Sequence, residues 1–300
     1  MLNIDDKDFH EFSNFLKRLN LSVKRNEQEQ ITKKVLDKTD LFVIGNPIDN
    51  YFSSIEVKSV VDFVRSGGSL LILSEYGSDF LQKTNVNDIS GKFGIFFEKN
   101  IVKEANSVNL NCTSLLHIQS FPDHSITKNI REINIGGICS LFLNREAKPL
   151  LVTPGNSFWT EIYNASSEQW IKEEEKQLII AAYTEFGKGK VAALGDIDIF
   201  TSNSRMGITS LDNRKFLQNL INWLAEPVEE SKVTSFVLDQ LGDLHYEIKE
   251  SNKILNNIIE TLTILEKRIT NLEENSEVNS QNLNHEKSFE SNSLLQEDKL

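Results

Sequence analysis

The sequence predicts an α/β fold: a flavodoxin-like or Rossmann-like, mostly parallel sheet with helices on both faces, followed by a coiled-coil helix and a disordered tail. Residues 54–73 have the pattern of a helix followed by a buried strand, and residues 187–224 that of a strand, a polar loop and a helix. A heptad repeat of Leu and Ile begins beyond Pro227. We therefore expect an α/β domain at residues 1–227, a coiled-coil helix at 228–273 and a disordered acidic tail at 274–300.

The first half of the chain alternates helices and buried strands. Apolar residues at helical spacing, such as Phe9, Phe12 and Leu16, predict a first helix that packs one face on a sheet. The expected elements are a helix at 8–19, a strand at 21–23, a helical turn at 31–36, a strand at 40–44, a helix at 54–65 and a strand at 70–73. The last three form a βαβ unit, whose two strands pair in parallel.

The second half begins with short elements around the main sheet. We expect strands at 94–97, 114–117, 133–135, 140–143 and 149–152, then a polar loop at 153–170. The length and Ala content of residues 178–183 fit a strand or a helix, and we favour a strand that forms a hairpin with the buried strand at 191–194. An amphipathic helix at 213–224 closes the domain, and Pro227 marks its end.

Beyond Pro227 the apolar period becomes that of a coiled coil. Positions a and d of almost five heptads carry Leu or Ile, with Ser251 as the polar interruption. The predicted oligomerisation residues are Leu241, Leu244, Ile248, Leu255, Ile258, Leu262, Leu265, Ile269 and Leu272. Ile254 and Ile259 widen this stripe, so a trimer, a tetramer or a hetero-bundle fits the pattern as well as a dimer. The alternative is one amphipathic helix docked on its own domain.

Charge and composition argue against several classes of protein. The net charge of −12 and the pI of about 5.0 disfavour a nucleic-acid binder, which presents a basic face. No apolar run approaches the ~20 residues of a membrane-spanning helix, and the start lacks a signal-peptide pattern. Cys112 and Cys139 have no metal-ligand spacing, and we expect free, buried thiols in a reducing compartment. The expected location is the cytoplasm.

Polar residues follow two predicted strands, where ligands bind in open α/β sheets. Ser74, Glu75 and Tyr76 come after the strand at 70–73. The candidate ligand-binding residues after the strand at 191–194 are Asp196, Asp198, Ser202 and Asn203. The structural alternative is that these side chains bind loop amides, and that Asp212 or Asn213 caps the last helix.

The sequence predicts no catalytic residue, cofactor or metal. A serine at a strand-to-helix turn invites comparison with a nucleophile elbow, but Ser74 lacks the G-x-S-x-G pattern. Neither His117 nor His124 has an acid at a spacing that would orient it as a base. The phosphate-binding pattern G-x-x-x-x-G-K-[ST] is also absent, so the sequence does not support ATP hydrolysis.

Three segments together carry a resemblance. They are D-L-F-V-I-G-N-P with the crossover V-V-D-F-V-R-S-G-G-S-L-L-I-L-S, the turn D-H-S-I-T-K-N-I, and G-K-V-A-A-L-G-D followed by D-N-R-K-F-L-Q-N-L-I-N-W-L. Over residues 8–225 the chain resembles class I glutamine amidotransferase-like domains. The nearest branch is non-catalytic: the N-terminal domain of the intraflagellar-transport subunit and gliding-motility ABC-transporter auxiliary proteins.

The chain departs from the catalytic members of that superfamily. They carry a cysteine at the elbow and a His-x-Glu pair near the domain end, whereas this chain has Ser74 and Glu75 at the elbow and no histidine between His124 and His245. The resemblance therefore implies a domain without glutaminase activity. Related domains also open with a strand, so the strand here is either very short or truncated, and it leaves an edge that a partner could fill.

These observations favour a non-catalytic assembly or scaffold protein. Its α/β domain would bind a partner or a small polar ligand, and its coiled coil would form a homo-oligomer or join a hetero-coiled-coil partner. The alternatives are a hydrolase that uses Ser74, Glu75 and Asp196, and a sensor of a sugar or nucleotide. Neither nucleic-acid binding nor membrane insertion is expected.

Overall fold

The computed structural model describes residues 1–26, 30–105, 113–228, 241, 244–245 and 247–269. It divides into two units, Met1–Phe236 and Val237–Leu300, which are described separately. The helices of the first unit are α1 (His10–Arg18), α2 (Lys33–Leu36), α3 (Ser54–Arg65), α4 (Ser78–Gln82), α5 (Val86–Ser90) and α6 (Asn213–Ala225), with the 3₁₀ turns η1 (Lys7–Phe9), η2 (Gly91–Phe93) and η3 (Asp198–Phe200). The strands are β1 (Leu41–Gly45), β2 (Ser69–Leu73), β3 (Ile95–Phe97), β4 (Asn100–Glu104), β5 (Leu115–Ile118), β6 (Ile133–Gly136), β7 (Leu141–Leu143), β8 (Lys148–Val152), β9 (Phe158–Asn164), β10 (Gln169–Lys172), β11 (Ile179–Phe186) and β12 (Gly189–Leu194).

The main sheet is mixed, which corrects the expectation of a mostly parallel sheet. Its order is β1-β2-β12-β11-β7-β3, and β8 also pairs with β11. Only β1, β2 and β12 pair in parallel. The chain reverses from β11 to β12 through a tight turn at Gly187, which has a positive φ, so these strands are antiparallel. β7 and β8 then pair antiparallel to β11, and β3 pairs antiparallel to β7.

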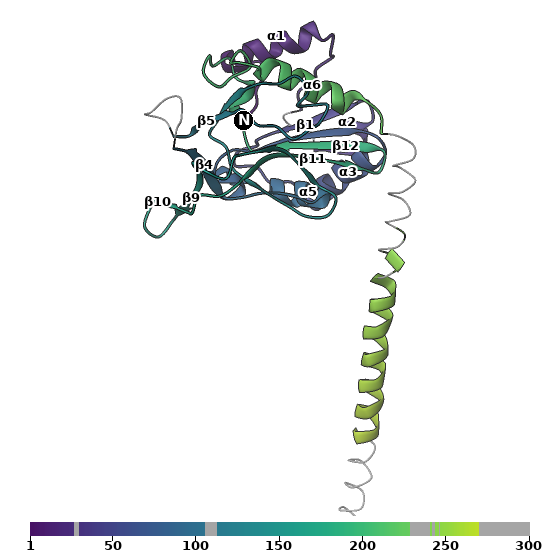
Figure 1. Cartoon of the computed structure of the whole chain (residues 1–300). Helices are drawn as coiled ribbons and strands as arrows, with labels where there is room; N and C mark the ends of the chain where they lie inside the picture. Colours follow the sequence, from purple (N-terminus) through teal and green to yellow (C-terminus); the bar gives the residue numbers. More distant parts are fainter. Residues whose placement is uncertain (27–29, 106–112, 229–240, 242–243, 246, 270–300) are drawn as a thin grey trace, which may run out of the picture. The chain divides into compact units, whose positions relative to one another are not determined.

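Helices lie on both faces of the main sheet (Figure 1). Leu71 and Leu73 of β2 pack with α1 and α6, whereas Leu70 and Ile72 pack with α3 and α5 on the other side. Successive side chains of a strand point to opposite faces, so a strand covered on both sides is apolar at every position. This explains why β2 and β12 were recognisable as short, continuous apolar runs.

Several predicted elements are confirmed, and others are wrong. The helices expected at 8–19, 54–65 and 213–224 form as α1, α3 and α6, and the segment expected as a strand at 178–183 forms β11 from Ile179 onwards. The expected strand at 21–23 does not form. The loop expected at 153–170 contains β9 and the start of β10, which form a second sheet with β4. β9 is rich in aromatic and β-branched residues, as strands are, but the polar residues around it masked this signal.

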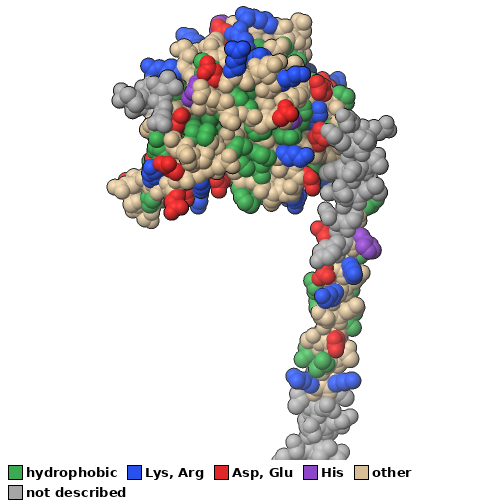
Figure 2. Space-filling view, in the orientation of Figure 1, with side chains coloured by type: hydrophobic (Ala, Val, Ile, Leu, Met, Phe, Trp, Pro, Cys, Tyr) green, Lys and Arg blue, Asp and Glu red, His purple; other side chains and the backbone are tan. Residues whose placement is uncertain are grey.

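The second unit contains a helix whose residues 247–269 are described without a gap. Eight Leu and Ile residues, which we call the apolar stripe, are each 47–58% exposed: Leu241, Leu244, Ile248, Leu255, Ile258, Leu262, Leu265 and Ile269. Figure 2 shows apolar side chains between charged ones along this helix. Leu272 and the expected tail at 274–300 lie outside the described residues, and the coiled coil stays a prediction. No helix in the described part of the chain is long and apolar enough to cross a membrane.

Candidate functional site at the carboxyl ends of three strands

The three parallel strands end at the same edge of the sheet. The backbone N–H of Asn46, just after β1, donates to Leu73 O, and that of Ser74, just after β2, donates to Leu194 O. Asp196 follows β12 directly after Gly195. Because parallel strands bring their carboxyl ends together, residues far apart in the sequence become neighbours here.

Three acidic side chains influence one another at this edge. Asp196 is fully buried, and its Oδ1 accepts a hydrogen bond of 2.6 Å from the backbone N–H of Asp198. Burial, and then the negative charge of Asp198, hold the pKa of Asp196 well above its ordinary value. Burial, and then Asp198, also raise the pKa of Glu75 to about 7, and burial raises the pKa of Asp198. The arrangement therefore disfavours full ionisation of the three groups.

Asn46 holds Glu75 in place. Its Nδ2 donates to Glu75 Oε2 at 3.3 Å and to Gln82 Oε1 at 3.5 Å. Gln82 Nε2 in turn donates to the backbone O of Tyr76 at 3.2 Å. These hydrogen bonds of Asn46 and Gln82 fix the position of the Glu75–Tyr76 segment. Asn46 and Gln82 were not among the predicted site residues, although the Gly-Asn-Pro turn after β1 marked this strand end.

Gly137 brings an aromatic ring and a carboxylate together. The N–H of Tyr76 donates to Gly137 O at 2.9 Å. A Cβ placed on Gly137 would lie 3.4 Å from Asp198 Oδ2 and 3.7 Å from Tyr76 Cδ1, and these are the described atoms within 4 Å of it outside Gly137 and its two chain neighbours. The Tyr76 ring also neighbours Trp170, at 6.2 Å between centroids, and each of these residues is more than a third exposed. One accessible point is thus lined by both a carboxylate and an aromatic ring.

Buried polar atoms without a hydrogen-bond partner gather in the same region. In the described part of the chain they are Asn46 Oδ1, Ser74 Oγ, Ser78 Oγ, Thr84 Oγ1 and Asp196 Oδ2. Three follow β1, β2 and β12 directly, and the other two belong to α4 and the turn after it. An unpartnered buried polar group costs ~1–3 kcal/mol, so its retention calls for an explanation. The edge that holds the acidic groups is therefore also the place where polar groups are left unsatisfied.

Two predicted site residues have structural contacts elsewhere. Ser202 Oγ accepts from the backbone N–H of Glu11, which ties its loop to the start of α1. Asn203 Oδ1 accepts from the backbone N–H of Arg205 within its own exposed turn. We therefore limit the candidate site to Ser74, Glu75, Tyr76, Asp196 and Asp198, with the addition of Asn46, Gln82, Gly137 and Trp170.

The alternative that Asp212 or Asn213 caps α6 is wrong. Asp212 occupies the N-cap position without a side-chain capping bond, and its Oδ2 accepts from the backbone N–H of Arg131. Asn213 is fully buried, and its Nδ2 donates to the backbone O atoms of Asn134, Met206 and Gly207. Both side chains therefore fasten loops to the start of α6.

The arrangement lacks the partners of a nucleophilic serine. Ser74 Oγ is buried without a hydrogen-bond partner. The His124 ring packs on Tyr183, with the centroids 4.2 Å apart, and burial lowers its pKa. His117 Nδ1 lies 2.8 Å from Asn134 Oδ1. Neither histidine is placed by these contacts to activate Ser74.

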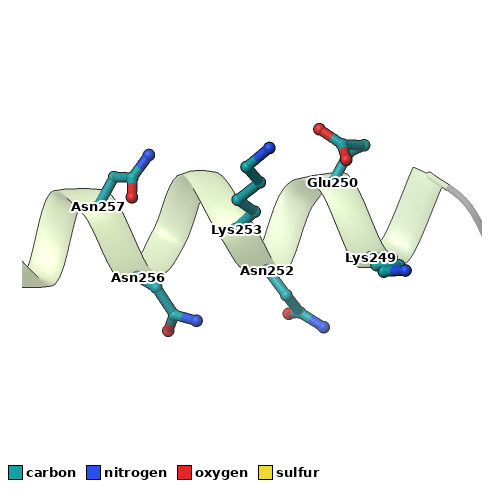
Figure 3. A pocket seen from close by; sticks show the side chains of 6 residues that line it. All are labelled: Lys249, Glu250, Asn252, Lys253, Asn256 and Asn257. Carbon is teal, nitrogen blue, oxygen red and sulfur yellow. The ribbon is translucent and has the colours of Figure 1, made fainter.

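The cysteines, the metal-ligating residue types and the polar surface of the C-terminal helix add no further candidate site. Cys139 is a free, buried thiol whose pKa is raised by burial, whereas Cys112 lies outside the described residues. Among the described residues, no group of three His, Cys, Asp or Glu is placed to hold a metal ion. A shallow hollow on the C-terminal helix is lined by the polar side chains in Figure 3: Lys249, Glu250, Asn252, Lys253, Asn256 and Asn257. All six project from the same helix, so they form an open polar surface.

The first unit is thus an α/β domain with a mixed sheet, and it has similarities to known proteins. Residues 1–107 match the family model of the IFT52 GIFT domain. The structure is similar to the mmIFT52 N-terminal domain, with a TM-score of 0.60 and 17% identity, over 75% of this chain and 93% of that one. At this identity the likeness concerns the fold. It supports the predicted resemblance to the intraflagellar-transport subunit, while the amidotransferase-like class stays a prediction.

Other solved structures are less similar. The cytoplasmic protein STM3548 from Salmonella typhimurium matches with a TM-score of 0.42 and 10% identity, over 75% of this chain and 89% of that one. A ThuA-like protein from Bacteroides uniformis matches with a TM-score of 0.43 and 14% identity, over 73% of this chain and 86% of that one. No curated protein matches the sequence significantly.

Proposed function

We propose that this chain is a non-catalytic assembly protein of the intraflagellar-transport type. Its α/β domain is a recognition module for a partner or a small polar ligand, and its C-terminal helix joins chains through the apolar stripe. The match of residues 1–107 to the IFT52 GIFT domain and the IFT52-like fold support this role for the domain. The domain limits that we propose are 1–227 for the module and 228–273 for the helix.

The observation that carries the proposal is the apolar stripe. Leu255, Ile258 and Leu262 are each more than half exposed, although such side chains are buried in folded proteins. Full burial of one Leu or Ile contributes ~1.5–3 kcal/mol, so covering the exposed half contributes ~1 kcal/mol. The summed free energy from eight such positions in each chain is comparable with the ~4–15 kcal/mol that association costs. The stripe can therefore hold two helices together only if most of its eight residues are buried in the contact.

The opposite face of the helix supports a docking role for the stripe. Five of the six residues in Figure 3 are at b, c or f positions of the heptad, away from the stripe, and Asn252 is at an e position beside it. Their Lys, Glu and Asn side chains remain hydrated at the surface of an oligomer. A helix with one apolar face and one polar face buries the apolar face against a partner. A second copy of the chain is the partner we favour, and a helix of another protein with the same heptad pattern is the alternative.

A charge introduced in the stripe tests this function. Leu255→Asp combined with Leu262→Asp places two carboxylates at core positions, and we expect a monomer by light scattering where the wild-type chain is an oligomer. Asn256→Asp combined with Thr263→Asp adds the same charge at two b positions of the heptad and should leave the mass unchanged. If both double variants have the wild-type mass, the stripe does not mediate assembly. If the wild-type chain is a monomer at tens of micromolar, a homo-oligomer is excluded.

A further inference from the structure

The structure assigns a binding site for a primary ammonium group to the surface over Gly137, between the Tyr76 ring and the carboxylates of Asp198 and Glu75. This inference specifies the ligand chemistry of the recognition role proposed for the α/β domain. It does not depend on assembly through the helix.

The geometry at Gly137 defines the point of contact. A methyl-sized group at its Cβ position would be in ordinary van der Waals contact with both Asp198 Oδ2, at 3.4 Å, and Tyr76 Cδ1, at 3.7 Å. Apart from Gly137 and its two chain neighbours, no third described atom lies within 4 Å of that position, and Gly137 itself is partly exposed. An ammonium nitrogen has a similar size and can approach a carboxylate oxygen to within a hydrogen bond of ~2.8 Å. The glycine therefore leaves room for a ligand atom where any other residue would place a side chain.

The charges around this point favour a cation. Glu75 and Asp198 are partly exposed, and no Lys or Arg in the described part of the chain forms an ion pair with either of them. The cationic group that acts on both is the α-amino group of Met1, whose effect is smaller than that of burial. An ammonium ligand over Gly137 would be a direct partner for the Asp198 carboxylate, and its positive charge would also act on Glu75, whose pKa the charge of Asp198 raises. A metal ion fits less well, because no three ligating side chains converge among the described residues.

The aromatic neighbours add a second attraction. Tyr76 is 39% exposed and Trp170 is 36% exposed, and the Trp170 ring also lies near that of Tyr163, with 5.5 Å between centroids. A cation over such a face gains ~0.5–2 kcal/mol. An aromatic wall beside a carboxylate is thus suited to an alkylammonium group, whose chain packs on the ring while its charge meets the acid.

The unpartnered buried atoms are an independent indication of a ligand. Asn46 is fully buried and donates to Glu75 through Nδ2, while its Oδ1 has no partner. Asp196 is also fully buried, and its Oδ2 has no partner although its Oδ1 holds the Asp198 backbone. The two side chains that carry these atoms contact the Glu75 carboxylate and the Asp198 backbone, and a ligand with its hydration water offers hydrogen bonds to such a region.

The test uses the full chain and ammonium groups from two sources. n-Butylamine represents a free amine and N-acetyl-lysine methylamide a lysine side chain, and both are titrated at pH 8 by saturation-transfer NMR and calorimetry. N-acetyl-norleucine methylamide, which keeps the alkyl chain without the charge, is the matched control, and glucose tests for a neutral hydroxylated ligand. We expect at least one ammonium probe to bind with a Kd on the order of 1 mM and both neutral probes to bind at least tenfold more weakly.

Variants locate the binding. Asp198→Asn and Glu75→Gln should each weaken ammonium binding about tenfold, as expected for the loss of one charged hydrogen bond. Gly137→Ala should abolish it by filling the contact point. Glu146→Gln removes a carboxylate from an exposed loop and should leave the affinity unchanged. The mass of each variant is measured in the same samples, so that loss of binding and loss of assembly are separate results.

Three results would overturn the assignment. The first is that neither ammonium probe shows binding when its concentration is 50-fold above the expected Kd of ~1 mM. The second is that glucose or the norleucine compound binds as tightly as the ammonium probes. The third is that Glu75→Gln, which keeps the hydrogen-bond acceptor for Asn46, binds ammonium as the wild-type chain does. If only the lysine compound binds, the source is a side chain of another protein, and if only n-butylamine binds, the source is a free amine.

Discussion

Replacement of Glu75 by Gln should stabilise the α/β domain at neutral and alkaline pH. Burial, and then Asp198, raise the pKa of Glu75 from 4.5 to about 7. The folded protein therefore keeps this carboxyl protonated at pH values where the unfolded chain has lost the proton. Gln resembles the protonated acid in shape, and its Oε1 can still accept the hydrogen bond from Asn46 Nδ2.

The size of the effect follows from the pKa. Each tenfold change in acid dissociation corresponds to ~1.4 kcal/mol, so a rise from 4.5 to about 7 makes ionised Glu75 cost about 3 kcal/mol in the folded state. Below pH 4.5 Glu75 is protonated in both states and costs nothing. Its contribution to the free energy of unfolding falls as the pH rises from 4.5 to 7, and is constant above 7. We expect Glu75→Gln to be more stable than wild type by ~1–3 kcal/mol at pH 8 and equal to it at pH 4.5.

Urea unfolding monitored by tryptophan fluorescence measures this difference. Trp159, Trp170 and Trp223 all lie in the first unit, so the signal reports the α/β domain and not the C-terminal helix. Glu146→Gln, on an exposed loop, controls for the change in net charge and should follow the wild-type pH profile. The reasoning is refuted if Glu75→Gln is less stable than wild type at pH 8, or if their difference is the same at pH 5 and pH 8.

Three further substitutions test the packing around the site. Asn213→Ala removes a buried side chain with four hydrogen bonds to the backbone, and should lower the free energy of unfolding by ~2–4 kcal/mol in urea. Gly195→Ala places a Cβ against the carbonyl oxygen of Cys139, so we expect little soluble protein, and a soluble variant with the wild-type circular dichroism spectrum and melting temperature would contradict this. Ser53→Ala breaks the capping box with Glu56 at the start of α3, and should cost ~1 kcal/mol by the same urea assay.

The elements of the parallel part of the sheet were predictable because each is specified by a pattern of neighbouring residues in the sequence. α3 begins at a capping box and carries apolar residues at helical spacing, and residues 70–73 of β2 form an uninterrupted apolar run. The sheet beyond β12 was not predictable in this way. β11 pairs with both β7 and β8, and these pairings depend on contacts between segments that are distant in the sequence, such as Ile179 with Leu141 and Tyr183 with Lys148. Short strands with exposed faces also leave no periodic pattern.

The residues of the candidate site were predictable only where they come directly after a strand. Glu75, Asp196 and Asp198 stand just after strands with clear apolar runs, and the structure brings them together. Ser202 and Asn203 satisfied the same rule, but the loop turns them towards α1 and into a local turn. Position after a strand thus predicts which residues can reach the edge of the sheet, while the path of each loop decides which of them do.

The segment between β2 and β12, which the sequence indicated to be peripheral, completes the site. Gly137 lies between β6 and β7, where its carbonyl binds the N–H of Tyr76 and where the N–H of Cys139 binds Gly195 O. Trp170 comes from β10, the exposed edge of a separate sheet. The parallel strands supply the carboxylates, but the contact point and the aromatic wall come from this inserted segment. A related chain with the same three strands and a different insertion would keep the acidic edge and lose the ammonium site, so the insertion determines the specificity that we propose.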